Sequence, residues 1–157
     1  MSRDVKETFE TILATLRAEC EVVLVRGGSH DVMLPTIRGG GTVERYDRGG
    51  YTVVHGDQAV DDHGTLIIGH DHPAIEIDLA RFPPCFLYGE GVVRGNDLIV
   101  LPAYNPLSPG VTINYAKSRD FLSPVLRRVD AGALQPVVEV DGETVVLPPL
   151  AGIRRFA

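Results

Sequence analysis

The spacing of apolar positions predicts an amphipathic helix near the start of the chain. Apolar residues recur every three or four positions between Val5 and Leu16, and the charged residues of this stretch lie mostly on the opposite face. Ser2 precedes the first apolar position and is suited to cap the helix. We therefore expect one amphipathic helix before the first strand.

The rest of the chain consists mainly of short apolar runs separated by glycine and proline, a pattern typical of strands. The segment from Ile37 to Gly50 is glycine-rich and charged, which favours a loop with one weak strand. The sequence Asp141-Gly142-Glu143 between two apolar runs predicts a hairpin. Short strands at close spacing predict two packed sheets in a single domain, residues 1–157. The expected strands are residues 22–25, 42–44, 51–54, 65–68, 74–79, 85–88, 97–101, 111–114, 137–140 and 144–147.

Composition narrows the class of protein. The chain has 157 residues, 44% of them hydrophobic, which is typical of a globular domain with a core. The net charge of −6 argues against binding a long phosphate backbone through a general positive field. Cys20 and Cys85 do not form a CxxC motif, and no apolar run resembles a leader or a membrane span. These features predict a reduced, cytoplasmic protein with no membrane partner.

Four of the five histidines lie in three short motifs, each after an apolar run: residues 28–31 (GSHD), 54–57 (VHGD) and 69–72 (GHDH). Histidine is the commonest metal ligand, and loops at strand ends expose such side chains. Each motif alone also fits a plainer interpretation. Residues 69–72 could carry two solvated loop histidines, His55 could belong to the core or to a sheet edge, and residues 28–31 could form a simple turn. His63 is expected in a surface loop.

Together and in this order, the motifs resemble the later motifs of the calcineurin-like metallophosphoesterases. That family's pattern runs D-x-H, G-D, G-N-H-D/E, an isolated H and G-H-x-H. Residues 28–31 stand at G-N-H-D, His55 stands at the isolated histidine, and residues 69–72 match G-H-x-H in full. The resemblance is to an archaeal-type branch of predicted phosphoesterases, which also includes DNA-ligase-associated members in bacteria. It extends outside the motifs to residues 67–76, 98–107, 121–124 and 149–155.

The resemblance implies an α/β fold, namely the later part of a metallophosphoesterase β-sandwich flanked by helices, with the leading strands missing. It implies a metal-dependent hydrolase of phosphomonoesters or phosphodiesters that uses Mn, Zn or Fe. By the resemblance, His30 would protonate or stabilise the leaving oxygen, and Asp31 would orient His30. The residues that the resemblance assigns to metal binding are Ser29, His55, His70 and His72.

Two departures from the family pattern predict impaired catalysis. No D-x-H or G-D motif occurs before Val22, and Ser29 stands where the family has a ligating asparagine. The site would then hold one ion rather than two. The alternatives are a non-catalytic metal-binding or assembly remnant of the family, and an open reading frame whose start was placed too late. The expected substrate is a phosphoester small molecule or a nucleic-acid derivative. The chain is expected to form homo-oligomers, because missing strands leave a sheet edge or an apolar face uncovered.

Overall fold

The N-terminal helix predicted from the apolar spacing is present and is longer than expected. In this computed structural model, which describes residues 3–28, 32–60, 64–76, 83–105, 107–108 and 110–153, helix α1 spans Arg3–Glu19. Leu13 is buried, whereas Val5 and Ile12 are exposed. The predicted cap, Ser2, lies outside the described residues.

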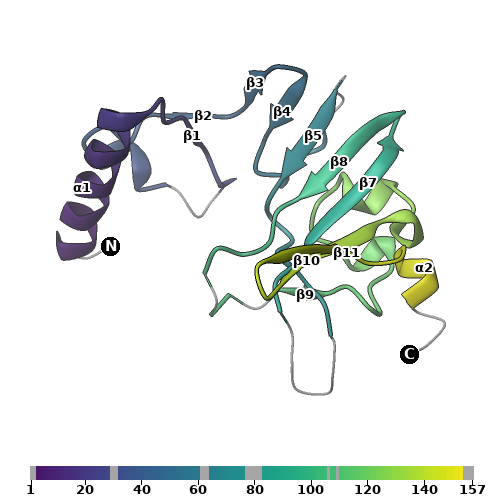
Figure 1. Cartoon of the computed structure of the whole chain (residues 1–157). Coiled ribbons are helices and arrows are strands. Elements are labelled where there is room, and N and C mark those ends of the chain that lie inside the picture. Colours follow the sequence, from purple (N-terminus) through teal and green to yellow (C-terminus); the bar gives the residue numbers. More distant parts are fainter. Residues whose placement is uncertain are drawn as a thin grey trace.

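Seven strands form one mixed sheet in the order β11-β10-β7-β8-β5-β4-β3 (Figure 1). Strands β4, β5 and β8 run parallel to one another, and the remaining neighbours are antiparallel. The predicted α/β class is confirmed, since the chain combines this large sheet with few helices. The strands are β3 (Tyr46–Arg48), β4 (Tyr51–Val53), β5 (Thr65–Ile68), β7 (Phe86–Val93), β8 (Asn96–Val100), β10 (Gln135–Val140) and β11 (Glu143–Val146).

The predicted hairpin near the C-terminus is present. Strands β10 and β11 pair in an antiparallel register that closes at Val140 and Glu143. Between them, Asp141 and Gly142 have φ angles of 52° and 82°. Two successive positive φ angles are typical of the type I′ turn, whose twist matches that of the flanking strands. The Asp-Gly pair thus determines both the position and the tightness of this turn.

Four strands lie outside the large sheet, in two parallel pairs: β1 (Leu24–Val25) with β2 (Thr42–Val43), and β6 (Pro73–Ala74) with β9 (Val111–Thr112). Of the strand expected at residues 74–79, the described part holds only the start, and residues 77–82 lie outside the description. The weak strand expected within the loop at residues 37–50 is present as β2, but the same segment also contains β3, which the sequence pattern did not predict. Its charges hide the strand, because Arg45 and Asp47 form an ion pair on the exposed side of β3.

Helical structure beyond α1 is short. Neither α-helix in the described part of the chain has the length and apolar character that crossing a bilayer requires. In Figure 1 most of this short helical structure lies beside or behind β7 and β8. The short helices are η2 (Leu34–Thr36), η3 (Ser118–Asp120), η4 (Leu126–Arg128), η5 (Ala131–Ala133) and α2 (Leu150–Ile153).

One continuous core joins the sheet to η4, η5 and α2. Leu66, Leu87 and Leu98 point from β5, β7 and β8 into this core and are at most 1% exposed. Phe121 and Leu150 pack from the C-terminal third of the chain and are fully buried. Because this core spans β5 to α2, it fixes the ends of the central strands.

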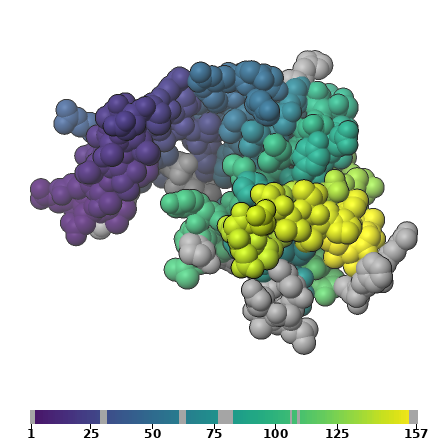
Figure 2. All heavy atoms as spheres, in the orientation of Figure 1, coloured from purple at the N-terminus to yellow at the C-terminus, as the bar shows by residue number. Residues whose placement is uncertain are grey.

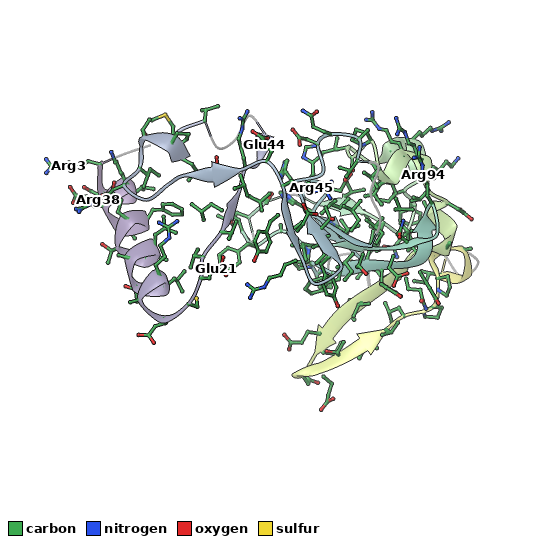
Figure 3. The ribbon with its side chains drawn as sticks, turned by 90° about the horizontal axis from the view of Figure 1, so that it is seen from above. Arg3, Glu21, Arg38, Glu44, Arg45 and Arg94 are labelled. Atoms are coloured by element: carbon green, nitrogen blue, oxygen red, sulfur yellow. The ribbon has the colours of Figure 1, made fainter. Side chains whose placement is uncertain are left out.

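The N-terminal arm, residues 3–45, stands apart from this sheet body, residues 46–153. Figures 1 and 2 show α1, β1 and β2 projecting to one side of the sheet. In Figure 3, seen from above, Glu44 and Arg45 lie where the arm meets the sheet. There Arg48 of β3 donates to Glu21 of the arm at 2.9 Å. The arm is therefore connected to the body along a narrow zone that includes exposed polar contacts.

Candidate functional site

The parallel pairing of β4 and β5 brings two of the predicted histidines together. His55 follows β4 and His70 follows β5, and the carboxyl ends of parallel strands lie at the same edge of a sheet. The distance from His70 Nδ1 to His55 Nε2 is 3.0 Å, with the ring centroids 4.7 Å apart. One of these two nitrogens carries the shared hydrogen and donates it. The other carries no hydrogen and accepts through its lone pair. The pair is partly buried.

His72 is held by a different partner. Its Nδ1 lies 3.0 Å from the hydroxyl oxygen of Ser108, in the loop after β8. This contact occupies Nδ1 and leaves Nε2 as the nitrogen available to a ligand. Gly110 lies against the carbonyl oxygen of His72 so closely that a Cβ at this position would clash. A glycine is therefore required where the chain returns past the histidine turn.

The histidine turn itself has a strained backbone. His70 has a φ of 26° and His72 a φ of 48°, in the left-handed region that non-glycine residues rarely adopt. Such residues persist only where the surrounding structure imposes them, and they cluster at functional sites. The Asp71 amide donates to the carbonyl of Gly69 at 2.6 Å, which tightens the turn between the two histidines.

Asp71, between the two histidines, is buried beneath the site. Its carboxylate accepts hydrogen bonds from the backbone amides of Leu122, at 2.5 Å, and Ser123, at 3.0 Å. Burial raises the pKa of this carboxyl above its usual value, while the two hydrogen bonds and the charges of His70 and Arg127 oppose that rise. Asp71 joins the turn to the segment at residues 121–123 and is also one of the residues that line the cavity of the histidines.

His55, His70 and His72 line one cavity of about 570 Å³, together with Ser108 and Leu122. A second cavity of about 330 Å³ shares His55. Its wall includes four charged side chains that the sequence analysis left without a role: Arg26, Glu44, Arg45 and Asp57. His55 thus borders both cavities, whereas His70 and His72 line only the larger of the two.

The remaining predicted site residues, Ser29, His30 and Asp31, lie outside the described residues. The described chain leads to the histidine pair, however. A Cβ built on Gly28 would lie 2.7 Å from a carboxylate oxygen of Asp57 and 3.7 Å from Cδ2 of His55. The backbone therefore reaches the site immediately before Ser29.

The separation of the two imidazole nitrogens can be compared with the spacing of two ligands on the metal ion that the resemblance implies. Two imidazole nitrogens bound to one tetrahedral ion at ~2.1 Å lie about 3.4 Å apart. The 3.0 Å separation between His55 and His70 is close to that spacing, so a small opening of the pair accommodates one ion. Within the described part of the chain, no group of three or more histidine, cysteine or acidic side chains is arranged to hold a metal. The described residues therefore fit a two-histidine ligand pair, and further ligands have to come from elsewhere.

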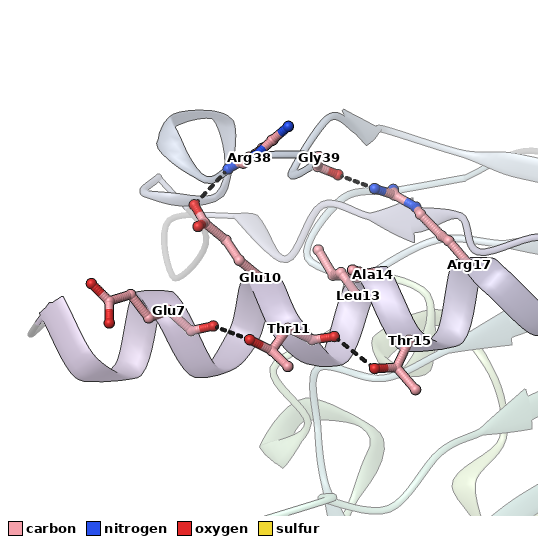
Figure 4. Close-up of a pocket in the computed structure, with 9 residues that line it drawn as sticks. All are labelled: Glu7, Glu10, Thr11, Leu13, Ala14, Thr15, Arg17, Arg38 and Gly39. Carbon is pink, nitrogen blue, oxygen red and sulfur yellow. Dashed lines mark hydrogen bonds between the residues drawn. The ribbon is translucent and has the colours of Figure 1, made fainter.

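A larger hollow of about 700 Å³ lies on the arm, between α1 and residues 38–39 (Figure 4). Its polar groups already have partners. Glu10 accepts from the Arg38 amide at 2.9 Å, and Arg17 donates to the Gly39 carbonyl at 2.6 Å. The described residues that line this hollow include no histidine or cysteine. The histidine cavity is therefore the better candidate for chemistry.

Sequence reasoning missed several residues of the site. Ser108 carries no local signal, and Leu122 belongs to a segment of the family resemblance that suggested no role for it, since the proximity of both residues to the histidines depends on contacts between distant segments. Asp71 and Asp57 occur inside recognised motifs, but their roles depend on burial and on the approach of Gly28. A carboxylate between two histidines could have been singled out as a partner for backbone amides.

Comparison with known proteins supports the fold of this arrangement. No protein-family model and no curated protein matches the chain. Among solved structures, the chain is similar to the nuclease MPE of Pseudomonas putida, with 20% sequence identity and a TM-score of 0.53. The match covers 85% of this chain and 57% of the nuclease chain, so this chain spans little more than half of its length. At this identity the likeness shows a shared fold.

Proposed function

We propose that this chain is a metal-dependent phosphoesterase of the calcineurin-like type, with His55 and His70 holding one divalent ion. The observation that carries the proposal is the 3.0 Å contact between these two imidazoles at the ends of parallel strands, in a cavity that His72 also lines. The fold shared with a nuclease supports phosphodiester hydrolysis as the reaction class. The order of the histidine motifs agrees with it.

In this proposal a bound ion would polarise the phosphoryl group and lower the pKa of a bound water. The protein's own residues do the rest. Ser108 occupies Nδ1 of His72 and so keeps Nε2 available as a ligand or a proton donor. Gly28 brings the chain to the pair, and His30 and Asp31 follow it in the sequence, where the resemblance assigns them to the leaving oxygen.

Imidazole nitrogens favour borderline ions, so we expect Zn²⁺ or Fe²⁺ to bind more tightly than Mn²⁺. Residues 1–27 carry neither the D-x-H nor the G-D motif that the family pattern places before residues 28–31, so this proposal assigns the chain no carboxylate that bridges two ions. Turnover by this chain alone should therefore fall far below ~10 s⁻¹, the median for enzymes. The net charge of −6 favours a small phosphodiester or a short nucleic-acid derivative over a long duplex.

Zinc titration by calorimetry, combined with hydrolysis of bis(p-nitrophenyl) phosphate, tests the proposal. The wild-type chain should bind about one ion and hydrolyse the diester slowly and only with metal. His55→Ala and His70→Ala should each weaken zinc binding by at least ~10-fold, because each removes one ligand of the pair. His63→Ala is the matched control, since His63 is the histidine outside the three motifs. Zinc affinity unchanged in His70→Ala would overturn the proposal.

A second candidate is a metal-binding module without turnover. The observation that favours it is the two-histidine set, which lacks a third ligand among the described residues. The same experiment separates the two candidates. Zinc binding that depends on His55 and His70, with no hydrolysis above the background of the His70→Ala variant, would assign the module. Slow hydrolysis that His70→Ala abolishes would assign the phosphoesterase.

A further inference from the structure

The Asp71 carboxylate connects two parts of the chain that are far apart in sequence. Asp71 is 1% exposed, and its two oxygens accept from amides 51 and 52 residues further along, those of Leu122 and Ser123. Hydrogen bonds to an ionised acceptor are stronger than those between neutral groups. This carboxylate therefore holds the histidine turn against the segment at residues 121–123.

That segment is a firm support. Phe121 and Ser123 are fully buried, and Phe121 belongs to the continuous core of the sheet body. Leu122, between them, lines the histidine cavity. The same two hydrogen bonds therefore fix the floor of the turn and one wall of the cavity.

The turn needs such support because both of its histidines have left-handed backbone conformations. The rest of the turn has modest ties. The Asp71 carbonyl accepts from the Val111 amide at 3.3 Å, and the Gly69 amide donates to the His55 carbonyl at 2.9 Å. Without the carboxylate, His70 and His72 would be free to relax toward ordinary φ values. Each ring would then leave its partner, His55 for His70 and Ser108 for His72.

We propose that Asp71 is the positioning residue of the histidine cavity, which fixes the imidazoles of His70 and His72 by anchoring their turn to the amides of residues 122 and 123. Its importance for metal binding rests on the proposed function, whereas its effect on the imidazoles does not. The requirement is for a carboxylate. An asparagine would offer one acceptor and turn its amide hydrogens toward a backbone donor, and a glutamate would extend past both donors.

Nitrogen-15 spectra of the imidazole side chains in the metal-free protein give a direct readout. In the wild type, the His55–His70 hydrogen bond should hold each ring in one tautomer, with well-separated ring-nitrogen signals. In Asp71→Asn, the signals of His55, His70 and His72 should move toward tautomer averages. A protein whose Asp71 only stabilises the fold would lose stability and keep this tautomer pattern.

Asp97→Asn is the matched control. The Asp97 carboxylate likewise accepts from a backbone amide, that of Gly91 at 2.9 Å, and from the Tyr88 hydroxyl at 3.1 Å, in the hairpin of β7 and β8. None of Tyr88, Gly91 and Asp97 lines the histidine cavity. Wild-type imidazole signals in Asp97→Asn, with altered signals in Asp71→Asn, would support the proposal. Equal changes in both variants would overturn it, because loss of any carboxylate contact with a backbone amide would then suffice.

Asp71→Glu covers the case in which Asp71→Asn does not fold. It keeps the charge and both acceptors but places them one methylene further out, so altered imidazole signals are again expected. A wild-type tautomer pattern in either folded variant overturns the proposal. Zinc titration is run in parallel, with ~10- to 100-fold weaker binding expected in the Asp71 variants. If the spectra change and the wild type binds no zinc, the positioning role stands and the proposed function fails.

Discussion

The N-terminal arm and the sheet body are held together by different kinds of contact. In the body, one continuous apolar core joins the strands to the short helices behind them. In the arm, Leu13 and Ile37 are the buried apolar residues among those described. The arm relies on exposed polar contacts, such as those of Lys6 and Arg17 to backbone carbonyls at residues 36 and 39.

This difference sets the scale of stability in each region. Burial of a large apolar side chain contributes about 1.5–3 kcal/mol. A hydrogen bond contributes about 0.5–1.5 kcal/mol net, and an exposed ion pair about 0–1 kcal/mol. The body should therefore unfold as one cooperative unit at high cost, and the arm should open locally at low cost. Helix α1 is therefore attached to the fold rather than being part of its core.

The largest expected effect comes from the core of the body. Phe121→Ala removes a fully buried ring and should lower the free energy of unfolding by about 3–5 kcal/mol. Ile12→Ala, on the arm, removes part of a side chain whose residue is 49% exposed. This substitution should change the free energy of unfolding by less than about 0.5 kcal/mol. Urea denaturation followed by circular dichroism measures both. Similar losses in the two variants would show that the arm and the body share one core.

The two cysteines report on the two regions without any substitution. Cys20 is exposed at the end of α1, and Cys85 is buried in the body, where burial raises the pKa of its thiol to about 12. At pH 8 a disulfide reagent should label Cys20 on mixing. Cys85 should react at least about 1,000-fold more slowly, because labelling requires the body to open and a thiolate to form. Rapid labelling of both thiols would contradict a stable body.

The smallest expected effect is on the local stability of α1 within the arm. Arg17→Ala removes the 2.6 Å hydrogen bond to the Gly39 carbonyl. It should destabilise α1 by about 1 kcal/mol, which corresponds to about 5-fold faster hydrogen exchange of its amides. Exchange in β5 and β8 should not change. Arg3→Ala is the control, since Arg3 contacts only Glu7 in an exposed pair, among the contacts described. Faster exchange in β8 would mean that the arm and the body open together.

Local pattern predicted those elements whose signals are local. The strand at residues 65–68 and the turn at Asp141-Gly142 occur where expected. Strand β7 was predicted to end at Tyr88 but continues to Val93, because Gly89 and Gly91 interrupt the apolar alternation without ending the strand. The periodicity of α1 predicted a helix but not which face is covered. The side that faces residues 36–39 carries Lys6, Glu10 and Arg17 as well as Leu13.

In the candidate site, too, some features have a local sequence signal and others do not. Positions at the ends of apolar runs predicted that His55, His70 and His72 converge; the structure places His55 against His70 and places His72 on the same cavity with Ser108 as its partner. The partners of His72 and Asp71 lie 36 and more than 50 residues away in the chain. No local pattern specifies such pairings, because they depend on how the segments after β8 fold back over the sheet.

The two outer strands of the large sheet bear on how copies of this chain could aggregate. An open sheet leaves one row of backbone donors and acceptors on each outermost strand, which another chain could extend. Strand β3 carries Asp47 and Arg48, and β11 begins at Glu143 and is followed by Pro148 and Pro149. Charged side chains oppose edge-to-edge pairing of two copies of the same strand, and proline has no amide hydrogen to donate. The charged margin at β3 therefore opposes strand addition, whereas β11 exposes Val145 and Val146 ahead of its prolines and is the margin to which a second chain would add a strand more readily.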